Sequence, residues 1–215
     1  MHILITAGGT REYIDPVRFI SNASSGRMGC ALARAALKAG HKVTLVTAPT
    51  SQRHPKGAKI VEVETAAQMF EAVKKYFHRC DCLIMAAAVA DYTPAQPARS
   101  KIRRERKTLT IKLKPTTDIL KWAGKHKKKS QIVVGFALEQ KALRARAGKK
   151  MREKNLDMIV ANTPAAIGAE KSTVHIKTLI SHWIRIEGAT KAAIADRIVR
   201  QVEWKYYDNA KSKNR

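Results

Sequence analysis

The chain has 215 residues, of which 45% are hydrophobic, and a formal net charge of +25. This length is enough for the core of one globular domain, and the longest apolar runs are much shorter than a membrane span. We therefore expect one domain over residues 1–210, with a basic tail at 211–215 and no membrane segment. Because Met1 leads directly into an apolar run instead of a signal peptide, we expect a cytoplasmic protein.

Cysteines and histidines predict neither a disulfide framework nor a metal cage. The three cysteines, Cys30, Cys80 and Cys82, form no C-x-x-C pair, and the seven histidines are scattered without an H-x-x-x-H motif. Free thiols are expected. Any Mg²⁺ would arrive with phosphate groups and take few protein ligands, so no metal-ligating residue is assigned.

The first fifty residues predict a β-loop-α-β unit. His2 to Ala7 reads as a buried strand, and Lys42 to Thr47 as a second, parallel one. Between them, Asn22 to Ser25 is expected to supply N-cap side chains, and Gly40 is expected to end the helix. The helix itself is indicated by apolar residues at helical spacing, namely Met28, Ala31, Leu32, Ala35 and Ala36. Such a unit is Rossmann-like.

Glycines flank this unit in an unusual pattern. Gly8 and Gly9 follow the first strand, and Gly26 and Gly29 open the helix, in place of G-x-G-x-x-G. Glycine permits close backbone approach, and the free amides of a helix's first turn can receive an anion. The pattern fits a phosphate site, but it equally fits tight packing alone, with Ser24 and Ser25 as simple caps.

The rest of the chain alternates between helical and strand patterns. Together with the first unit it predicts an α/β fold, a doubly wound and mainly parallel sheet with a C-terminal antiparallel extension. Residues 92–112 interrupt this scheme and are interpreted either as a flap over the strand ends or as a surface loop, with strand character resuming at 108–113. Expected helices are 66–78, 117–126, 140–155 and 191–207; expected strands are 82–86, 131–136, 157–161, 174–176 and 183–186.

The positive charge is concentrated in the second half. Residues 1–100 hold 13 Lys and Arg against 7 Asp and Glu, whereas residues 101–215 hold 29 against 10. A basic surface suits a nucleic acid, but no helix-turn-helix, zinc finger or aromatic RNA-binding motif accompanies it. The charge also suits a strongly anionic substrate. A non-enzymatic nucleic-acid binder therefore remains the alternative to an enzyme.

Seven motifs occur in order along nearly the whole chain: Gly8-Gly-Thr-Arg-Glu12, Asp15-Pro-Val-Arg-Phe-Ile-Ser-Asn22, Ser24-Ser-Gly-Arg-Met-Gly29, Ala86-Ala-Ala-Val-Ala-Asp-Tyr92, Lys101-Ile102, Val134-Gly-Phe-Ala137 and Lys154-Asn-Leu-Asp-Met-Ile-Val-Ala-Asn162. Together they closely resemble the phosphopantothenoylcysteine synthetases, also called phosphopantothenate-cysteine ligases. In bacteria this activity is often fused to a flavin-dependent decarboxylase. No flavoprotein half is recognised here, so we expect a stand-alone synthetase without flavin and a separate downstream phosphopantothenoylcysteine decarboxylase.

The resemblance implies a ligase of coenzyme A biosynthesis. Such enzymes join 4'-phosphopantothenate to L-cysteine by attack of the carboxylate on a nucleotide α-phosphate, loss of pyrophosphate, and attack of the cysteine amine on the acyl-nucleotidylate. Negative charge grows on phosphoryl and acyl oxygens, which calls for cations, amide donors and Mg²⁺. CTP is the favoured co-substrate and ATP the alternative.

The resemblance also implies residue roles. Asn22 matches the asparagine that holds the acyl group, and Lys101 matches a flap lysine over the phosphates. Ala87, Ala88 and Asp91 match positions that bind pantothenate. Arg18 matches an arginine that reaches phosphopantothenate from a neighbouring subunit, which implies a homodimer.

For the nucleotide, the resemblance implies a larger set. The lysine pair Lys150 and Lys154, four residues apart on a predicted helix, is characteristic of the CTP-using bacterial type, although such a pair could also be solvated charge. The full implied set is Gly9, Ser24, Gly26, Gly29, Asp91, Lys101, Lys114, Pro115, Thr116, Thr117, Phe136, Lys150, Lys154 and Asn162.

Some positions depart from the family pattern. Arg27 replaces the more common lysine, and Leu138 to Gln140 and Ala169 to Lys171 differ near the expected base site, which puts base preference in question. A nicotinamide-dependent oxidoreductase shares the β-α-β start. It is disfavoured because no acidic residue follows the second strand at Thr47 to Thr50 and no Tyr-x-x-x-Lys motif occurs.

Overall fold

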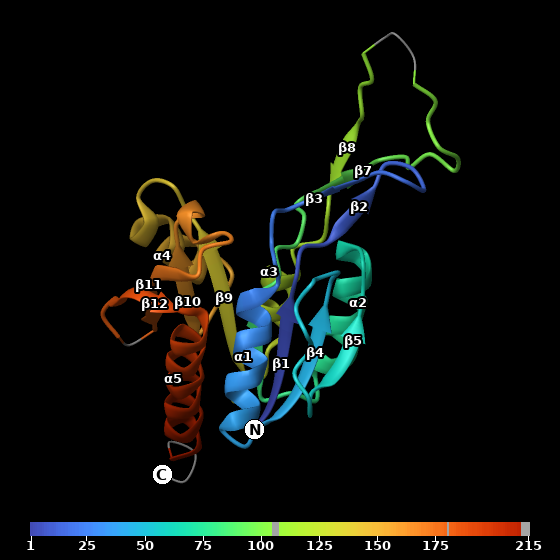
Figure 1. The fold of residues 1–215 in the computed structure, drawn as a ribbon. Helices are drawn as coiled ribbons and strands as arrows, with labels where there is room; N and C mark the ends of the chain where they lie inside the picture. Colours follow the sequence, from blue (N-terminus) through green and yellow to red (C-terminus); the bar gives the residue numbers. More distant parts are fainter. Residues whose placement is uncertain (105–107, 180, 212–215) are drawn as a thin grey trace.

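The central sheet of the computed structural model has eight strands in the order β12-β11-β10-β9-β6-β1-β4-β5 (Figure 1). The structure describes residues 1–104, 108–179 and 181–211. From β10 to β5 along this order, all neighbouring strands are parallel. Strand β11 runs antiparallel to both β10 and β12. The strands are β1 (His2–Ala7), β4 (Lys42–Thr47), β5 (Lys59–Glu62), β6 (Cys82–Met85), β9 (Ile132–Leu138), β10 (Met158–Asn162), β11 (Lys171–Thr178) and β12 (Ile184–Thr190).

Helices cover both faces of this sheet. On one face α1 (Arg27–Lys38) and α5 (Lys191–Lys211) lie side by side, and their apolar residues share a core with β1, β4 and β10 (Figure 1). On the other face α2 (Ala66–Phe77), α3 (Ile119–His126) and α4 (Leu143–Glu153) enclose a second core. The doubly wound α/β prediction is confirmed, including its antiparallel C-terminal extension.

Local sequence explains why the helices begin where they do. Thr65 caps α2 and forms a reciprocal capping box with Gln68, and Asp118 caps α3 by accepting from the Lys121 amide at 2.9 Å. Gly40, at a φ of 79°, follows α1 and ends it as expected. All five predicted helices are present, within a few residues of the predicted bounds.

The expected side-chain cap of α1 is wrong. The N-cap residue is Gly26, in the left-handed conformation at a φ of 73°, and no side chain from Asn22–Ser25 caps the helix. The tight approach of Thr50 explains this, because a Cβ on Gly26 would lie 2.6 Å from the Thr50 Oγ1, which donates to the Ser25 carbonyl at 2.7 Å. The first turn of α1 therefore keeps its amides uncapped.

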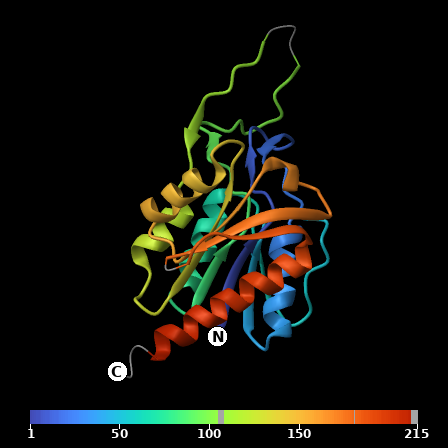
Figure 2. The same ribbon diagram turned by 90° about the vertical axis from the view of Figure 1, so that its left-hand side faces the viewer.

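Two short hairpins extend beyond the sheet and were not predicted. One joins β2 (Arg11–Tyr13) to β3 (Phe19–Ser21), and the other joins β7 (Tyr92–Pro94) to β8 (Leu113–Pro115). Figure 2 shows the described residues between β7 and β8, 95–104 and 108–112, extending away from the sheet. The flap predicted at 92–112 comprises β7 and this segment, and its residues 105–107 lie outside the described residues.

The strand expected at residues 108–113 is wrong for most of its length. Only Leu113–Pro115 is a strand, because its partner β7 ends at Pro94 and the following Pro97 has no amide hydrogen to extend the ladder. Strand β5 was also missed. Of the predicted basic tail, residues 212–215 lie outside the described residues. Within the described part of the chain, no helix has the length and apolar character needed to span a bilayer.

Candidate active site

A cavity of about 600 Å³ opens at the carboxyl ends of β1, β6 and β9. Strand β1 leads to a helix on one face of the sheet and β6 to a helix on the other, so the crevice between them is the usual ligand position in this fold. Most of the residues that the sequence singled out line this cavity: Asn22, Ser24, Gly26, Gly29, Ala87, Ala88, Asp91, Thr116, Thr117, Phe136, Lys150, Lys154 and Asn162.

One side of the cavity is the turn from Ser24 to Gly29, which we call the glycine wall. Its polar groups are backbone amides at the uncapped start of α1, together with the Ser24 and Ser25 hydroxyls and the Arg27 guanidinium. Gly29 packs so closely on β1 that a Cβ there would overlap the Ala7 side chain and lie 2.9 Å from the Thr6 carbonyl oxygen. An anion can therefore approach the helix N-terminus, where the amides and the helix dipole favour negative charge.

Asn22 lies at the junction between this wall and the loop that follows β6. Its side-chain amide donates to the carbonyl oxygens of Val89, at 3.1 Å, and Ala88, at 3.4 Å. The loop itself is fixed to β1, because the Ala87 amide donates to the Thr6 hydroxyl at 3.1 Å and the Ala88 amide to the Gly8 carbonyl at 2.8 Å. Asn22 is thus held against the predicted pantothenate positions.

The opposite side carries Lys150 of α4 and Lys154, the C-cap residue of that helix, which we call the lysine wall. Lys150 donates to the Phe136 carbonyl oxygen at 2.8 Å, and Lys154 pairs with Asp118 at 2.7 Å. Burial, and then the charge of Lys154, lower the pKa of Lys150. Burial raises the pKa of Asp118, but the bonds from Lys154 and the Lys121 amide outweigh it, so that this pKa is lowered overall.

The remaining predicted positions approach the cavity from other elements. Phe136 and Asn162 lie on the neighbouring strands β9 and β10. Thr116 follows β8 and is tied to the loop after β6, since its hydroxyl donates to the Ala90 carbonyl at 2.6 Å and its amide to the Asp91 carbonyl at 2.9 Å. Residues distant in sequence are therefore brought to one site.

Five predicted residues do not line the cavity. Gly9 lies directly behind the wall, where a Cβ would be 2.7 Å from the Asn22 carbonyl oxygen. Lys114 and Pro115 are exposed on β8, and Lys101 is exposed on the loop beyond β7. Arg18 is held in the β2–β3 hairpin by Asp15, with its Nε at 2.9 Å from the carboxylate.

Asp15 joins this hairpin to the flap. Its buried carboxylate accepts from the amides of Val17 and Arg18 at 2.9 and 2.8 Å, from the Arg18 guanidinium, and from the Ile102 amide at 3.1 Å. The Arg18 side chain also donates to the Ile102 carbonyl at 2.7 Å. The guanidinium holds the pKa of Asp15 well below its usual value. Lys101 is therefore adjacent to a fixed anchor.

Sequence reasoning missed several lining residues. Lys191, the first residue of α5, lies near Arg27 and donates to the Ala166 carbonyl at 3.1 Å and the Ser172 hydroxyl at 2.9 Å. Asp118, Ala166 at the end of the short 3-10 helix Pro164–Ala166, and Ile167 were not predicted either, whereas Ala169, expected near the base site, does line the cavity. A lysine next to a predicted hairpin gives no local signal that it reaches a cavity.

The described part of the chain supplies few metal ligands. Among the described residues, no group of three or more His, Cys, Asp or Glu side chains is placed to hold a metal ion. Two carboxylates, Asp91 and Asp118, line the cavity, and Asp118 is already engaged by Lys154. This donor set fits an Mg²⁺ held mainly by phosphate oxygens.

Residues 1–205 match the family model described as the DNA/pantothenate metabolism flavoprotein C-terminal domain. The chain belongs to this family. It is 49% identical over 206 residues to the coenzyme A biosynthesis bifunctional protein CoaBC of Bacillus subtilis (strain 168), a match that covers 94% of this chain and 50% of the relative. The family resemblance inferred from the motifs is confirmed.

Two further comparisons agree with this placement. A protein named cysteine/cysteine sulfinic acid decarboxylase, from an unknown prokaryotic organism, is 44% identical over 205 residues, which are 93% of this chain and 57% of the relative. The crystal structure of the C-terminal domain of a CoaBC protein has a TM-score of 0.82 and 39% identity, with 96% of each chain covered. The chain spans about half the length of the curated relatives it matches.

Proposed function

We propose that this chain is a phosphopantothenate-cysteine ligase of coenzyme A biosynthesis that uses CTP. One observation carries the proposal: a single cavity brings Asn22, the glycine wall and the lysine wall together in a member of the family to which the CoaBC proteins belong. An amide donor, free backbone amides and two cations around one space are what an acyl-phosphoryl reaction needs. The polar, phosphorylated substrates suggest a cytoplasmic setting.

The first step activates the carboxylate of 4'-phosphopantothenate. A carboxylate oxygen attacks the α-phosphorus of CTP, the bond to the β-phosphate oxygen breaks, and pyrophosphate leaves. The amides of the glycine wall and the ammonium groups of Lys150 and Lys154 would bind the charged phosphates from opposite sides. Mg²⁺, held mainly by phosphate oxygens with Asp91 nearby, would neutralise the leaving group. Lys101 would reach the phosphates by movement of the flap.

The second step forms the amide. The neutral amine of L-cysteine attacks the acyl carbon of the acyl-cytidylate, CMP leaves with the electron pair of the broken C–O bond, and the amine gives up a proton. Asn22 lines the cavity, and its side-chain amide, which donates to the Val89 carbonyl at 3.1 Å, would turn to donate to the acyl oxygen as its charge grows. The product retains the cysteine carboxylate, which a separate phosphopantothenoylcysteine decarboxylase would then remove.

The preference for CTP rests on the lysine wall. Lys150 and Lys154 point to the family's bacterial type, and both line the cavity beside Phe136 and Asn162, the expected neighbours of the base. Ala87 and Ala88 leave room for the pantothenate chain, and Asp91 can accept from its hydroxyl or amide. ATP is the alternative nucleotide.

We further propose a homodimer formed through the β2–β3 hairpin. Val17, Phe19 and Ile20 are large apolar residues exposed there, with 58%, 41% and 36% of their surface accessible. A second copy would bury them and bring Arg18 toward the partner's phosphopantothenate. Phe19→Lys is expected to give monomers in light scattering, whereas Leu179→Lys, an exposed apolar position on the far end of the sheet, is expected to stay dimeric.

The test is pyrophosphate release by the purified protein with 4'-phosphopantothenate and Mg²⁺, with CTP compared with ATP, before and after addition of cysteine. Release that requires phosphopantothenate supports the activation step, and the faster nucleotide identifies the co-substrate. If neither CTP nor ATP gives pyrophosphate release, the proposal is contradicted. Salt-sensitive DNA binding without turnover would then favour the nucleic-acid binder.

A further inference from the structure

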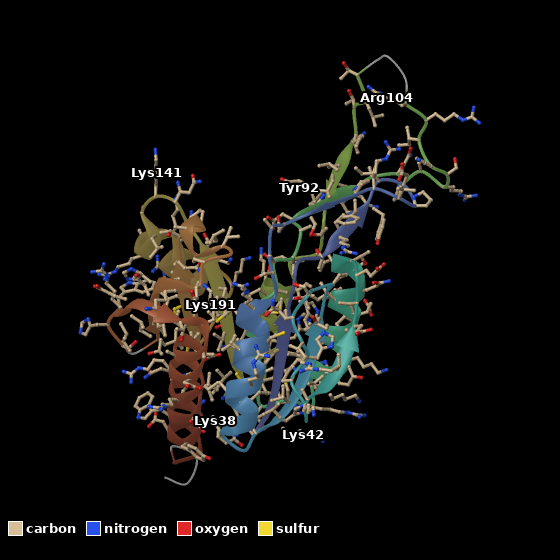
Figure 3. The ribbon with its side chains drawn as sticks, viewed as in Figure 1. Lys38, Lys42, Tyr92, Arg104, Lys141 and Lys191 are labelled. Carbon is tan, nitrogen blue, oxygen red and sulfur yellow. The ribbon has the colours of Figure 1, made fainter. Side chains whose placement is uncertain are left out.

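A second, smaller cavity of about 410 Å³ lies between α1 and α5, on the face of the sheet that these helices cover. It adjoins the main cavity, because Arg27, Ala169 and Lys191 line both. Figure 3 shows Lys191 at the start of α5 and Lys38 near the far end of α1. We call this space the α1–α5 groove.

Four cationic side chains line the α1–α5 groove: Arg27, Arg34, Lys38 and Lys191. Three of these side chains donate hydrogen bonds to neutral acceptors. Lys191 donates to the Ala166 carbonyl and the Ser172 hydroxyl, Arg27 to the Gly168 carbonyl at 3.4 Å, and Arg34 to the Arg53 carbonyl at 3.3 Å. Within the described residues, none of the four pairs with a carboxylate within 4 Å.

Like charges face each other where the two cavities meet. Burial, and then the charge of Arg27, lower the pKa of Lys191, so the pair is held together against its own repulsion. Glu170 and Asp196 also line the groove, which leaves an excess of two positive charges. A bound anion would relieve this repulsion, because it would interact with both cations at once.

The spacing of the cations selects the size of the anion. Arg27, Arg34 and Lys38 follow one stripe of α1, separated by seven and then four residues. At about 1.5 Å per residue, Arg27 and Arg34 are roughly 10 Å apart along the helix axis. One phosphate cannot contact cations along this whole stripe, whereas two linked phosphates can engage neighbouring ones.

We propose that the α1–α5 groove binds a pyrophosphate group and continues the phosphate path out of the main cavity. Lys191 and Arg27 form its entrance, and Arg34 and Lys38 its outer part. The inference that the groove binds an anion follows from its cationic side chains alone. The choice of pyrophosphate rests on the proposed function, which releases this anion in the adjoining cavity.

Isothermal titration calorimetry with inorganic pyrophosphate, in buffer without Mg²⁺, tests the proposal. The variant Arg34→Gln/Lys38→Gln removes two exposed charges that line only the groove. The control Lys75→Gln/Lys125→Gln removes two exposed lysines from α2 and α3 on the opposite face. We expect the groove variant to weaken pyrophosphate binding roughly tenfold, as for loss of charge-assisted contacts, and the control to stay within about twofold.

Equal affinities for the two double variants would overturn the proposal. A second variant, Lys191→Gln, is expected to weaken pyrophosphate binding at least as much, with its folded state checked by thermal melting because Lys191 bonds two neighbouring segments. A parallel titration with CTP shows whether the groove binds free pyrophosphate or the phosphates of the nucleotide. CTP binding will depend on Arg34 and Lys38 only if the nucleotide's own phosphates occupy the groove. The titration needs no turnover, so groove-dependent binding without pyrophosphate release would contradict the ligase and leave the groove standing.

Discussion

The glycine wall and the lysine wall face the same cavity but are built from different chemistry. The glycine wall offers backbone amides held by the packing of α1 on β1, and its polar groups do not titrate. The lysine wall offers flexible ammonium groups, whose charge depends on burial, on each other and on Asp118. A change in the first wall is therefore a packing change, whereas a change in the second is an electrostatic one.

The largest effect on turnover is expected from Asn22→Ala, at the edge of the glycine wall. Removal of a donor to a developing acyl oxygen should lower the rate of amide formation about 100-fold. The melting temperature should change little, because the Asn22 side chain is exposed. Rapid-quench measurements should show an acyl-cytidylate that accumulates. An equal loss in pyrophosphate release would place Asn22 in the activation step instead.

The glycine wall itself can be broken by Gly29→Ala. The added methyl group would overlap Ala7, and we expect a loss of about 2 kcal/mol in the free energy of unfolding, measured in urea. Gly148→Ala is the matched control. It is also a buried helical glycine, but its Cβ would lie 3.7 Å from the nearest atom, so this change should be neutral or stabilising. Similar losses in both variants would contradict the packing argument.

The lysine wall should respond in nucleotide binding rather than in stability. Lys154→Gln removes a cation from the cavity and should raise the KM for CTP roughly tenfold. Lys149→Gln, on the same helix but outside the cavity and 3.7 Å from Glu153, should leave this KM within about twofold. If both variants behave alike, the lysines act only through the general positive charge.

The smallest effect is a pH dependence specific to the lysine wall. The pKa of Lys150 is lowered, so its amine loses the proton at a lower pH than an ordinary lysine. Phosphates bind the protonated form, and kcat/KM for CTP should therefore fall as the pH rises through this lowered pKa. Lys150→Arg should move the fall to higher pH, since guanidinium keeps its charge. An unchanged profile would show that another group titrates.

The sequence predicted the parts of this molecule that depend on local pattern. Apolar runs and helical spacing identified the parallel strands other than β5, and the helices α1 to α5, because a buried face has a period that can be read. The hairpin β2–β3 has three-residue strands with exposed residues such as Phe19 and Ile20, which leave no such period. Strand β5 is a half-exposed edge strand and was missed for the same reason.

Most of the residues that line the cavity were predicted from motifs in register, but the residues that pair with them were not. Lys150 and Lys154 could be named from the family resemblance, but Asp118, the partner of Lys154, lies 36 residues earlier and carries no motif. Lys191 reaches Arg27 only because α5 returns to the start of α1. The cap of α1 was misassigned because serines before a helix usually cap it, whereas here the N-cap is Gly26, where Thr50 occupies the space that any side chain would need.

In the proposed homodimer, the carboxylate of Asp15 would link subunit association to catalysis. The hairpin that would meet a second copy and the loop that carries Lys101 both hydrogen-bond to it. Contacts that order the hairpin therefore also favour the ordered state of the loop near Ile102, by thermodynamic linkage. Specific activity should then rise with enzyme concentration across the dissociation constant of the dimer, and Asp15→Asn should weaken that dependence.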